Sequence, residues 1–171
     1  MIRIVGFGAA VLLLAAVAGC AGQEPPTDPP VSTERLARAV EVEAALQEFM
    51  DTWERADVEP LVASFTPDAV IYDPTPPGEV RGADAIRSFV IDFLEANQQI
   101  AVEISDVRVS TDGSVGWTTC RYRFVAHTDG EERFSEGNLT VIFVMQPDES
   151  YRVALFHASR LLEPSGATDP Q

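Results

Sequence analysis

Asp73 is the carboxylate in this sequence whose surroundings best suit acid–base chemistry. It follows a short apolar run, residues 69–72, and precedes Pro74. A carboxylate buried in an apolar pocket has a raised pKa and can act as a general base that moves a proton between carbon atoms. An aspartate before a proline also has a structural use, because its oxygens accept hydrogen bonds from loop amides. The sequence leaves both roles open for Asp73.

His157 is the second candidate for proton transfer. Its spacing from Val153, Leu155 and Ser159 is that of a strand, so we expect all four side chains on one face. There His157 could exchange a proton or hold the carboxylate of a ligand. A histidine packed between strands with its hydrogen bonds satisfied is the alternative. The catalytic candidates are therefore Asp73 and His157.

Neither a metal site nor a cofactor is expected. His127 and His157 lie in different predicted strands, and the sequence has no HxH or HxxxH pair. It also has no glycine-rich phosphate loop and no Gly-x-Ser-x-Gly elbow. Cys120 is expected to be a buried apolar thiol, because a nucleophilic cysteine would need a neighbouring base.

The charge of the chain narrows the choice of partners. It has 27 acidic and 12 basic residues and a net charge of −15, which argues against a nucleic-acid partner. Arg121 and Arg123 share a predicted strand face with Trp117 and Thr119. Such a face could bind an acidic ligand. The alternative is a solvated face whose arginines pair with some of the many carboxylates.

The first 20 residues predict that the protein is localised to the bacterial cell envelope. One positive charge precedes an apolar segment, residues 4–17, which is too short to span a membrane. The segment ends in Val-Ala-Gly-Cys at 17–20 and resembles a lipoprotein signal peptide whose lipidation site is Cys20. Acyl chains on Cys20 would anchor the protein to the lipid bilayer, facing the periplasm or the cell exterior. An ordinary secretory signal, with Cys20 incidental, is the alternative.

A single folded domain is expected between two segments poor in core residues. Residues 21–32 are rich in proline and predict an extended tether, and residues 163–171 predict a disordered tail. Residues 33–162 are about the size of one domain. With Cys20 consumed by lipid, Cys120 has no cysteine with which to pair, so the domain depends on its apolar core.

Three helices are predicted from the 3.6-residue spacing of apolar side chains and from capping residues. The first helix is expected to begin at the capping residue Thr33 and to end near Ala56. The second is expected over 58–65, after the N-cap Asp57, and residues 66–68 are expected to form the turn that closes it. The third is expected to follow residues 81–84. The apolar stripes of the first and third helices are Val42, Ala45, Leu46, Phe49, Met50 and Trp53, and Ile86, Phe89, Val90, Phe93 and Leu94.

Alternating apolar residues predict strands in the rest of the domain. A short strand at 69–72 is followed by four strands joined by tight turns, at 99–109, 115–126, 132–145 and 151–161. We expect bulges near residues 105–106, where the alternation changes parity, and at Gly137. The order α-α-β-β-α-β-β-β-β predicts an α+β fold, an antiparallel meander with helices on one face. The other face could pair with a second copy in a homodimer or remain partly exposed.

Four motifs in this order resemble the NTF2-like superfamily and its SnoaL-like branch. They are FTPDAV at 65–70, DP at 73–74, RGADAI at 81–86 and YRVALFHAS at 151–159, where the family usually begins the last motif with Trp. The resemblance implies a cone in which a curved antiparallel sheet wraps around three helices and encloses an apolar pocket. Its wall is expected to include Phe49, Trp53, Tyr72, Phe89 and Trp117. Members of the family include enzymes and non-catalytic binders, so fold alone does not assign the function.

The ketosteroid isomerase branch gives Asp73 the position of its general base. That branch also uses a tyrosine and a protonated aspartate to stabilise the enolate oxygen, and their positions here hold Phe49 and Leu139. Because both donors are missing, ketosteroid isomerase activity is not expected. The favoured prediction is a membrane-anchored module that binds a small apolar molecule or dimerises. The alternatives are an isomerase, cyclase or hydrolase with Asp73 as base on an apolar carbonyl substrate, and a structural envelope protein with a filled core.

Overall fold

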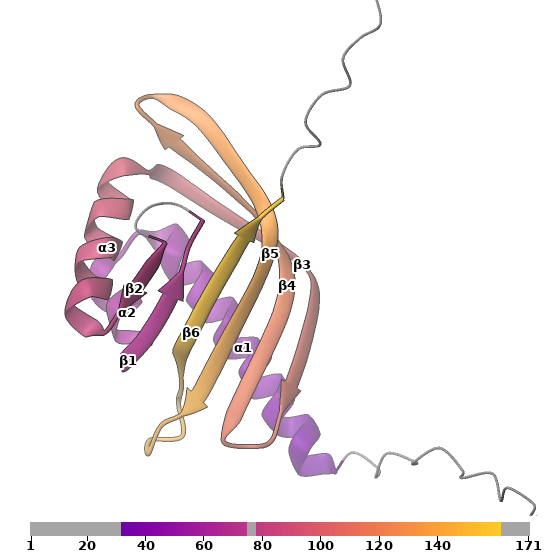
Figure 1. The fold of residues 1–171 in the computed structure, drawn as a ribbon. Helices are drawn as coiled ribbons and strands as arrows, with labels where there is room; N and C mark the ends of the chain where they lie inside the picture. Colours follow the sequence, from indigo (N-terminus) through magenta and orange to yellow (C-terminus); the bar gives the residue numbers. More distant parts are fainter. Residues whose placement is uncertain (1–31, 75–77, 162–171) are drawn as a thin grey trace, which may run out of the picture. The chain divides into compact units, whose positions relative to one another are not determined.

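The computed structural model describes residues 32–74 and 78–161. The predicted signal peptide with Cys20, the tether up to residue 31 and the tail from residue 163 lie outside the described residues. Three helices and six strands follow one another in the predicted order (Figure 1). Their bounds are α1 Thr33–Arg55, α2 Val58–Ala63, β1 Phe65–Tyr72, β2 Glu79–Arg81, α3 Ala83–Ala96, β3 Gln98–Thr111, β4 Val115–Thr128, β5 Glu131–Met145 and β6 Tyr151–Arg160.

Helix α1 begins and ends close to the predicted positions, with a different capping residue. The N-cap is Ser32, whose hydroxyl accepts a hydrogen bond from the backbone N–H of Arg35 at 3.2 Å, and not Thr33. This bond satisfies one of the N–H groups that the first turn leaves without a helical partner. At the other end, Ala56 adopts the left-handed conformation, with φ of 51°, and donates to the carbonyl of Trp53. No helix within the described ranges 32–74 and 78–161 is long and apolar enough to span a membrane.

Helix α2 is shorter than predicted, because the strand after it begins earlier. The helix ends at Ala63, and β1 starts at Phe65. The carbonyl of Ser64 already accepts a hydrogen bond from the backbone N–H of Val153 in β6. Residues 66–68, predicted to be the turn that closes the helix, are therefore part of β1. Pairing with a distant strand overrides the turn preference of Thr-Pro-Asp.

The six strands form one sheet in the order β2-β1-β6-β5-β4-β3. The meander β3 to β6 is antiparallel, as predicted, and so is the pair β1–β2. The contact of β1 with β6 is parallel, so the sheet is mixed and not wholly antiparallel. This pairing brings Phe65 beside Val153 and Tyr72 beside His157. It therefore joins the first strand of the domain to the last.

Irregular points in the sheet decide which side chains face inward. The bulge predicted at 105–106 is confirmed, since the register of β3 shifts between Ser105 and Arg108. The bulge predicted at Gly137 is wrong, because β4 and β5 stay in register there. An unpredicted bulge lies in β6, where Ile142 pairs with Leu155 while Phe143 pairs with Val153, leaving Ala154 as the extra residue. This bulge reverses the parity of β6.

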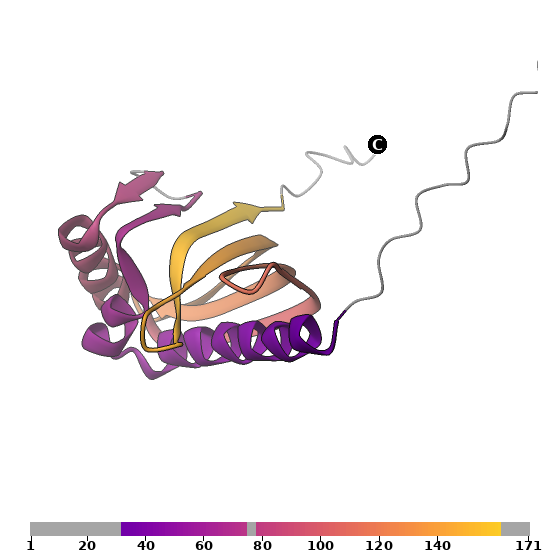
Figure 2. The same cartoon turned by 90° about the horizontal axis from the view of Figure 1, so that it is seen from below.

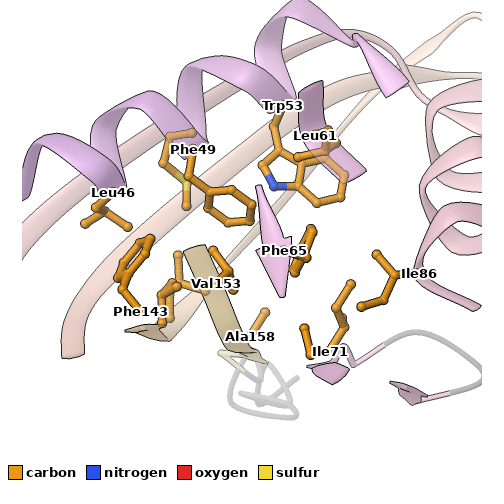
Figure 3. Packing of buried hydrophobic residues seen from close by; sticks show 14 of the residues in the cluster. Leu46, Phe49, Trp53, Leu61, Phe65, Ile71, Ile86, Phe143, Val153 and Ala158 are labelled. Atoms are coloured by element: carbon orange, nitrogen blue, oxygen red, sulfur yellow. The ribbon is translucent and has the colours of Figure 1, made fainter. Parts of the chain in front are cut away.

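The core lies between the helices and the concave face of the curved sheet. Figures 1 and 2 show α1 crossing this face, with α3 next to β1 and β2. Side chains from α1, including Leu46 and Phe49, point toward Phe143 and Val153 of the sheet (Figure 3). The ring centroids of Phe49 and Phe65 are 5.3 Å apart at an edge-to-face angle of 85°. Each large apolar side chain buried in this way contributes about 1.5–3 kcal/mol.

Candidate functional site

A cavity of about 920 Å³ lies beside the packed core. Its wall combines residues of α1 and α3, of β2 and the two residues that follow β1, and of β3 to β6. A cavity of this size is large enough for a drug-sized molecule. The fold is therefore packed around Phe49 but open between α3 and the concave face of the sheet.

Aromatic side chains from four elements form the apolar wall of the cavity. The ring of Trp53 in α1 lies 5.3 Å, edge-on, from that of Phe93 in α3. Phe93 in turn lies 5.4 Å from Phe124 in β4 and 5.8 Å from Phe89. The helical stripes place Trp53, Phe89 and Phe93 toward the sheet, because residues three to four positions apart share one helix face. Phe156 of β6 lies next to Trp53, with centroids 6.4 Å apart.

Few uncharged polar groups interrupt this wall. The hydroxyl of Tyr122 in β4 and that of Ser135 in β5 lie 3.2 Å apart, within hydrogen-bond distance. The indole of Trp53 is 6% exposed, and its buried Nε1 has no hydrogen-bond partner among the described residues. A buried donor without a partner costs stability unless a water or ligand oxygen accepts its hydrogen bond. The hydroxyls of Tyr122 and Ser135 are therefore polar groups that the cavity offers to an occupant.

Charged side chains line the cavity where it meets solvent. Those with a negative charge are Asp73, Glu79 and Asp92, and those with a positive charge are Arg81, Arg133 and Arg160. Asp73 is half-buried, and its backbone N–H donates to the carbonyl of Gly78 at 3.0 Å. That bond closes the loop between β1 and β2. The hydrogen bond holds the backbone of Asp73 at the cavity, which its side chain lines.

Three of the residues predicted for the site line this cavity: Asp73, Trp53 and Phe89. Phe49 was predicted for the same wall but is 2% exposed and borders a separate cavity of about 170 Å³. Its ring is enclosed by those of Phe65, Trp53 and Phe156. Phe49 is therefore a core residue that supports the aromatic wall from behind.

Tyr72, Trp117 and His157 were also predicted for the site, but they lie on the opposite face of the sheet. Trp117 is 41% exposed and alternates along β4 with the inward-facing Thr118. Tyr72 and His157 contact each other edge-on, with ring centroids 6.0 Å apart, on neighbouring strands β1 and β6. The predicted common face of Val153 and His157 is wrong, because the bulge at Ala154 leaves Val153 in the core and His157 exposed. Asp73 and His157 consequently do not converge on one cavity.

Several residues of the wall were not predicted from sequence. They are Phe93, Tyr122, Phe124, Ser135, Phe156 and Arg160. The signal for two of them is present in β4, where Tyr122 and Phe124 alternate with Arg121 and Arg123. The exposed arginines mark the convex face, so the aromatic residues between them must face inward. No comparable signal exists for Phe156, whose orientation depends on the bulge at Ala154.

The convex face of the sheet carries aromatic residues among charged pairs. Arg121 lies 3.6 Å from Asp106, and Arg123 lies 3.6 Å from Glu136. Of the two alternatives left open for these arginines, the structure has the second, in which they pair with carboxylates of their own sheet. A homodimer formed through this face stays a prediction.

Metal ligands do not gather at the cavity. Over the described ranges of the chain, no group of three His, Cys, Asp or Glu side chains is arranged to hold a metal ion. Cys120 is buried in the inner row next to Leu139, with which it is paired across β4 and β5. Burial disfavours the thiolate and raises the pKa of Cys120 to about 11.

We expect the thiol of Cys120 to be unreactive in the folded protein. Thiol reagents react with the thiolate, and both the pKa of about 11 and the burial of Cys120 limit this form. At pH 8 we therefore expect the folded protein to react at least about tenfold more slowly than the unfolded protein. Modification by Ellman's reagent, in a Cys20→Ser chain where Cys120 is the remaining cysteine, would measure this with and without guanidinium. The folded-state pKa lies above the ordinary value of 9.0, so stability should hold below pH 9 and fall as pH rises through the folded value. Equal rates in native and denaturing buffer would contradict this expectation.

Comparison with known proteins places the fold. The model of the SnoaL-like domain family matches residues 42–163. Solved structures with the same fold include a ketosteroid isomerase-like protein from Erwinia carotovora atroseptica, 19% identical, with a TM-score of 0.65 over 74% of this chain and 98% of that one. Another is a proposed dehydratase of the NTF2-like family from Streptomyces avermitilis, 20% identical, with a TM-score of 0.69 over 75% and 99%.

A third solved structure has the same fold. It is a Nuclear transport factor 2 (NTF2-like) superfamily protein from Salmonella enterica, 14% identical, with a TM-score of 0.66 over 80% of this chain and 99% of that one. Curated protein sequences contain no match. These identities support the fold alone, whereas the family model covers most of the folded domain. The chain therefore belongs to the SnoaL-like domain family and has the NTF2-like fold.

Proposed function

We propose that this protein is a small-molecule binding module, held at the bacterial cell envelope by acyl chains on Cys20. The observation that carries the proposal is the cavity of about 920 Å³, with its aromatic wall and few polar groups. Such a site binds an apolar molecule mainly by removing its surface from water, while a few donors fix its orientation. A filled core, the third alternative, would leave no such space.

Binding without reaction is favoured by how the candidate groups are placed. General acid–base catalysis needs a base and a donor within hydrogen-bond reach of the same substrate. Asp73 lines the cavity, but His157 is exposed on the other face of the sheet. Phe49 and Leu139 have no donor to offer an enolate oxygen.

An enzyme remains the second candidate, because Asp73 reaches a cavity that also contains the hydroxyls of Tyr122 and Ser135. A carboxylate base and two hydroxyl donors are the groups that proton transfer next to a carbonyl requires. The structural relatives include proteins described as a ketosteroid isomerase-like protein and a proposed dehydratase. This candidate predicts a substrate with an acidic C–H bond.

Native mass spectrometry of the full chain from its own host should separate the two candidates. We expect the wild type and an Asp73→Asn variant to retain the same small molecule in similar amounts, since the apolar wall supplies most of the affinity. Asp92→Asn is the matched control, because Asp92 also lines the cavity but belongs to α3. If Asp73→Asn alone accumulated a chemically different, unreacted molecule, the enzyme candidate would replace the binding module. Cavities empty in every preparation would count against both.

Anchoring makes a separate prediction. Cys20→Ala removes the thiol that would carry the acyl chains, so the protein should leave the membrane fraction almost completely, because stable attachment needs more than one chain. Fractionation and immunoblotting of wild type and variant measure the change. Cys120→Ala is the control and should stay with the membranes. Unchanged fractionation of Cys20→Ala would sink the lipoprotein proposal and leave the binding cavity unaffected.

A further inference from the structure

One row of residues across the inner face of the sheet differs from its apolar neighbours. Tyr122 of β4 is directly opposite Gly137 of β5, which is directly opposite Arg160 of β6. The next row toward the core contains Cys120, Leu139 and Ala158 and is apolar. The row of Tyr122 thus places a phenol and a guanidinium on either side of a glycine.

Gly137 is closely covered by its neighbours and accepts no side chain. A Cβ at this position would overlap the backbone carbonyl oxygen of Ser159 and would lie 2.8 Å from Cε1 of Tyr122, so the tyrosine ring leans over the glycine. The hydroxyl of Tyr122 is thereby carried toward β5, where it lies 3.2 Å from that of Ser135. Paired strands lie about 4.7–4.9 Å apart, so Arg160 begins one strand away from Gly137 on the other side from Tyr122. This part of the cavity wall therefore carries two hydroxyls and one positive charge.

Arg160 differs from the other arginines that line the cavity. Arg81 pairs with Glu79 at 3.3 Å, and Arg133 pairs with Glu131 at 3.5 Å. No carboxylate among the described residues forms an ion pair with Arg160. This holds although the chain has 27 acidic and 12 basic residues, so that carboxylates are plentiful. Arg160 supplies a charge that an anionic ligand group could neutralise.

We infer that the cavity binds an amphipathic carboxylate, with its apolar body against Trp53, Phe93 and Phe124 and its carboxylate between Arg160 and Tyr122. This inference rests on the proposed binding function and names the ligand class of the same site. The planar guanidinium matches the two oxygens of a carboxylate, and a phenol can donate to either of them. The aromatic wall excludes water from the apolar body of the ligand. Because Arg160 is exposed, the carboxylate of the ligand can meet the guanidinium near solvent and stay ionised.

The two tryptophans of the chain allow binding inside the cavity to be measured directly. Trp117 lies on the convex face, so Trp117→Phe leaves Trp53 in the cavity wall as the remaining tryptophan. Pyrenebutanoic acid and its uncharged primary amide share one apolar body and differ in the carboxylate. Energy transfer from Trp53 to the pyrene, in the full chain with Trp117→Phe, reports the affinity of each probe for the cavity.

We expect the acid to bind about tenfold more tightly than the amide, because a charge-assisted pair is stronger than a neutral one. Arg160→Gln should abolish this preference and leave the affinity for the amide unchanged. Arg152→Gln is the matched control, since Arg152 is on the same strand β6 but points to the convex face, opposite Val144. Circular dichroism checks that both variants fold.

The outcomes separate this inference from the function on which it rests. If both probes bound equally to the wild type, or if Arg160→Gln kept the preference for the acid, the inference would be wrong while the binding cavity stood. If neither probe quenched Trp53, the inference and the proposed binding function would fall together. A Tyr122→Phe variant that lost several-fold in affinity for the acid alone would assign part of the preference to the phenol.

Discussion

Phe49→Ala should destabilise the protein by about 3–5 kcal/mol, as other buried phenylalanine truncations do. The ring of Phe49 is 2% exposed and lies edge-on to Phe65 at 5.3 Å and to Phe156 at 5.8 Å. Its removal opens a hole between α1 and the sheet that these rings cannot close without moving. Since domains of this size are stable by about 5–15 kcal/mol, the loss is a large share of the total. Urea unfolding followed by circular dichroism measures it.

The matched control for this variant is Phe134→Ala. Phe134 is 63% exposed on β5, where its ring receives the guanidinium of Arg123 at 5.4 Å from the centroid. Losing that contact costs less than about 1 kcal/mol at an exposed site. Similar losses from the two variants would mean that Phe49 does not support the aromatic wall as its burial indicates.

The fold was predictable because its elements have clear periodicities. The stripe from Val42 to Trp53 requires a helix with one apolar face, and the alternation in β4 requires a strand with one face inward. Their order then limits the topology to an α+β sheet with helices on one side. The boundary between α2 and β1 was not predictable in the same way, because Ser64 ends its helix through a hydrogen bond to Val153, about 90 residues later in the chain.

The candidate site was harder to predict because it depends on which alternate residues of β6 face the cavity. One extra residue, Ala154, turns Phe156 into the cavity and His157 out of it. Nothing in the sequence around Ala154 marks a bulge, since neither glycine nor a turn residue is present. Asp73 was found because a loop before proline is recognisable locally. Arg160 was not, because its role depends on Gly137 of the neighbouring strand.

Gly137→Ala is the second substitution expected to have a large effect. The glycine does not have a positive φ, so its requirement comes from close approach and not from backbone conformation. A Cβ there would overlap the backbone carbonyl oxygen of Ser159 in β6 and would also press on the ring of Tyr122. Backbone atoms in a paired strand cannot move aside as a flexible side chain can. We therefore expect a loss of about 1–3 kcal/mol or more, the range for overpacking in a dense core.

A double variant identifies which contact causes this loss. Tyr122→Ala removes the ring but leaves the carbonyl of Ser159, so Gly137→Ala should remain destabilising in that background by nearly as much. Asn138→Ala, next in the chain with an exposed side chain, is the control and should change stability by less than about 0.5 kcal/mol. If Tyr122→Ala fully suppressed the effect of Gly137→Ala, the glycine would exist to seat the tyrosine ring. If suppression is small, the close approach of β5 and β6 requires the glycine, and the lack of a side chain between Tyr122 and Arg160 is a consequence of how the strands pack.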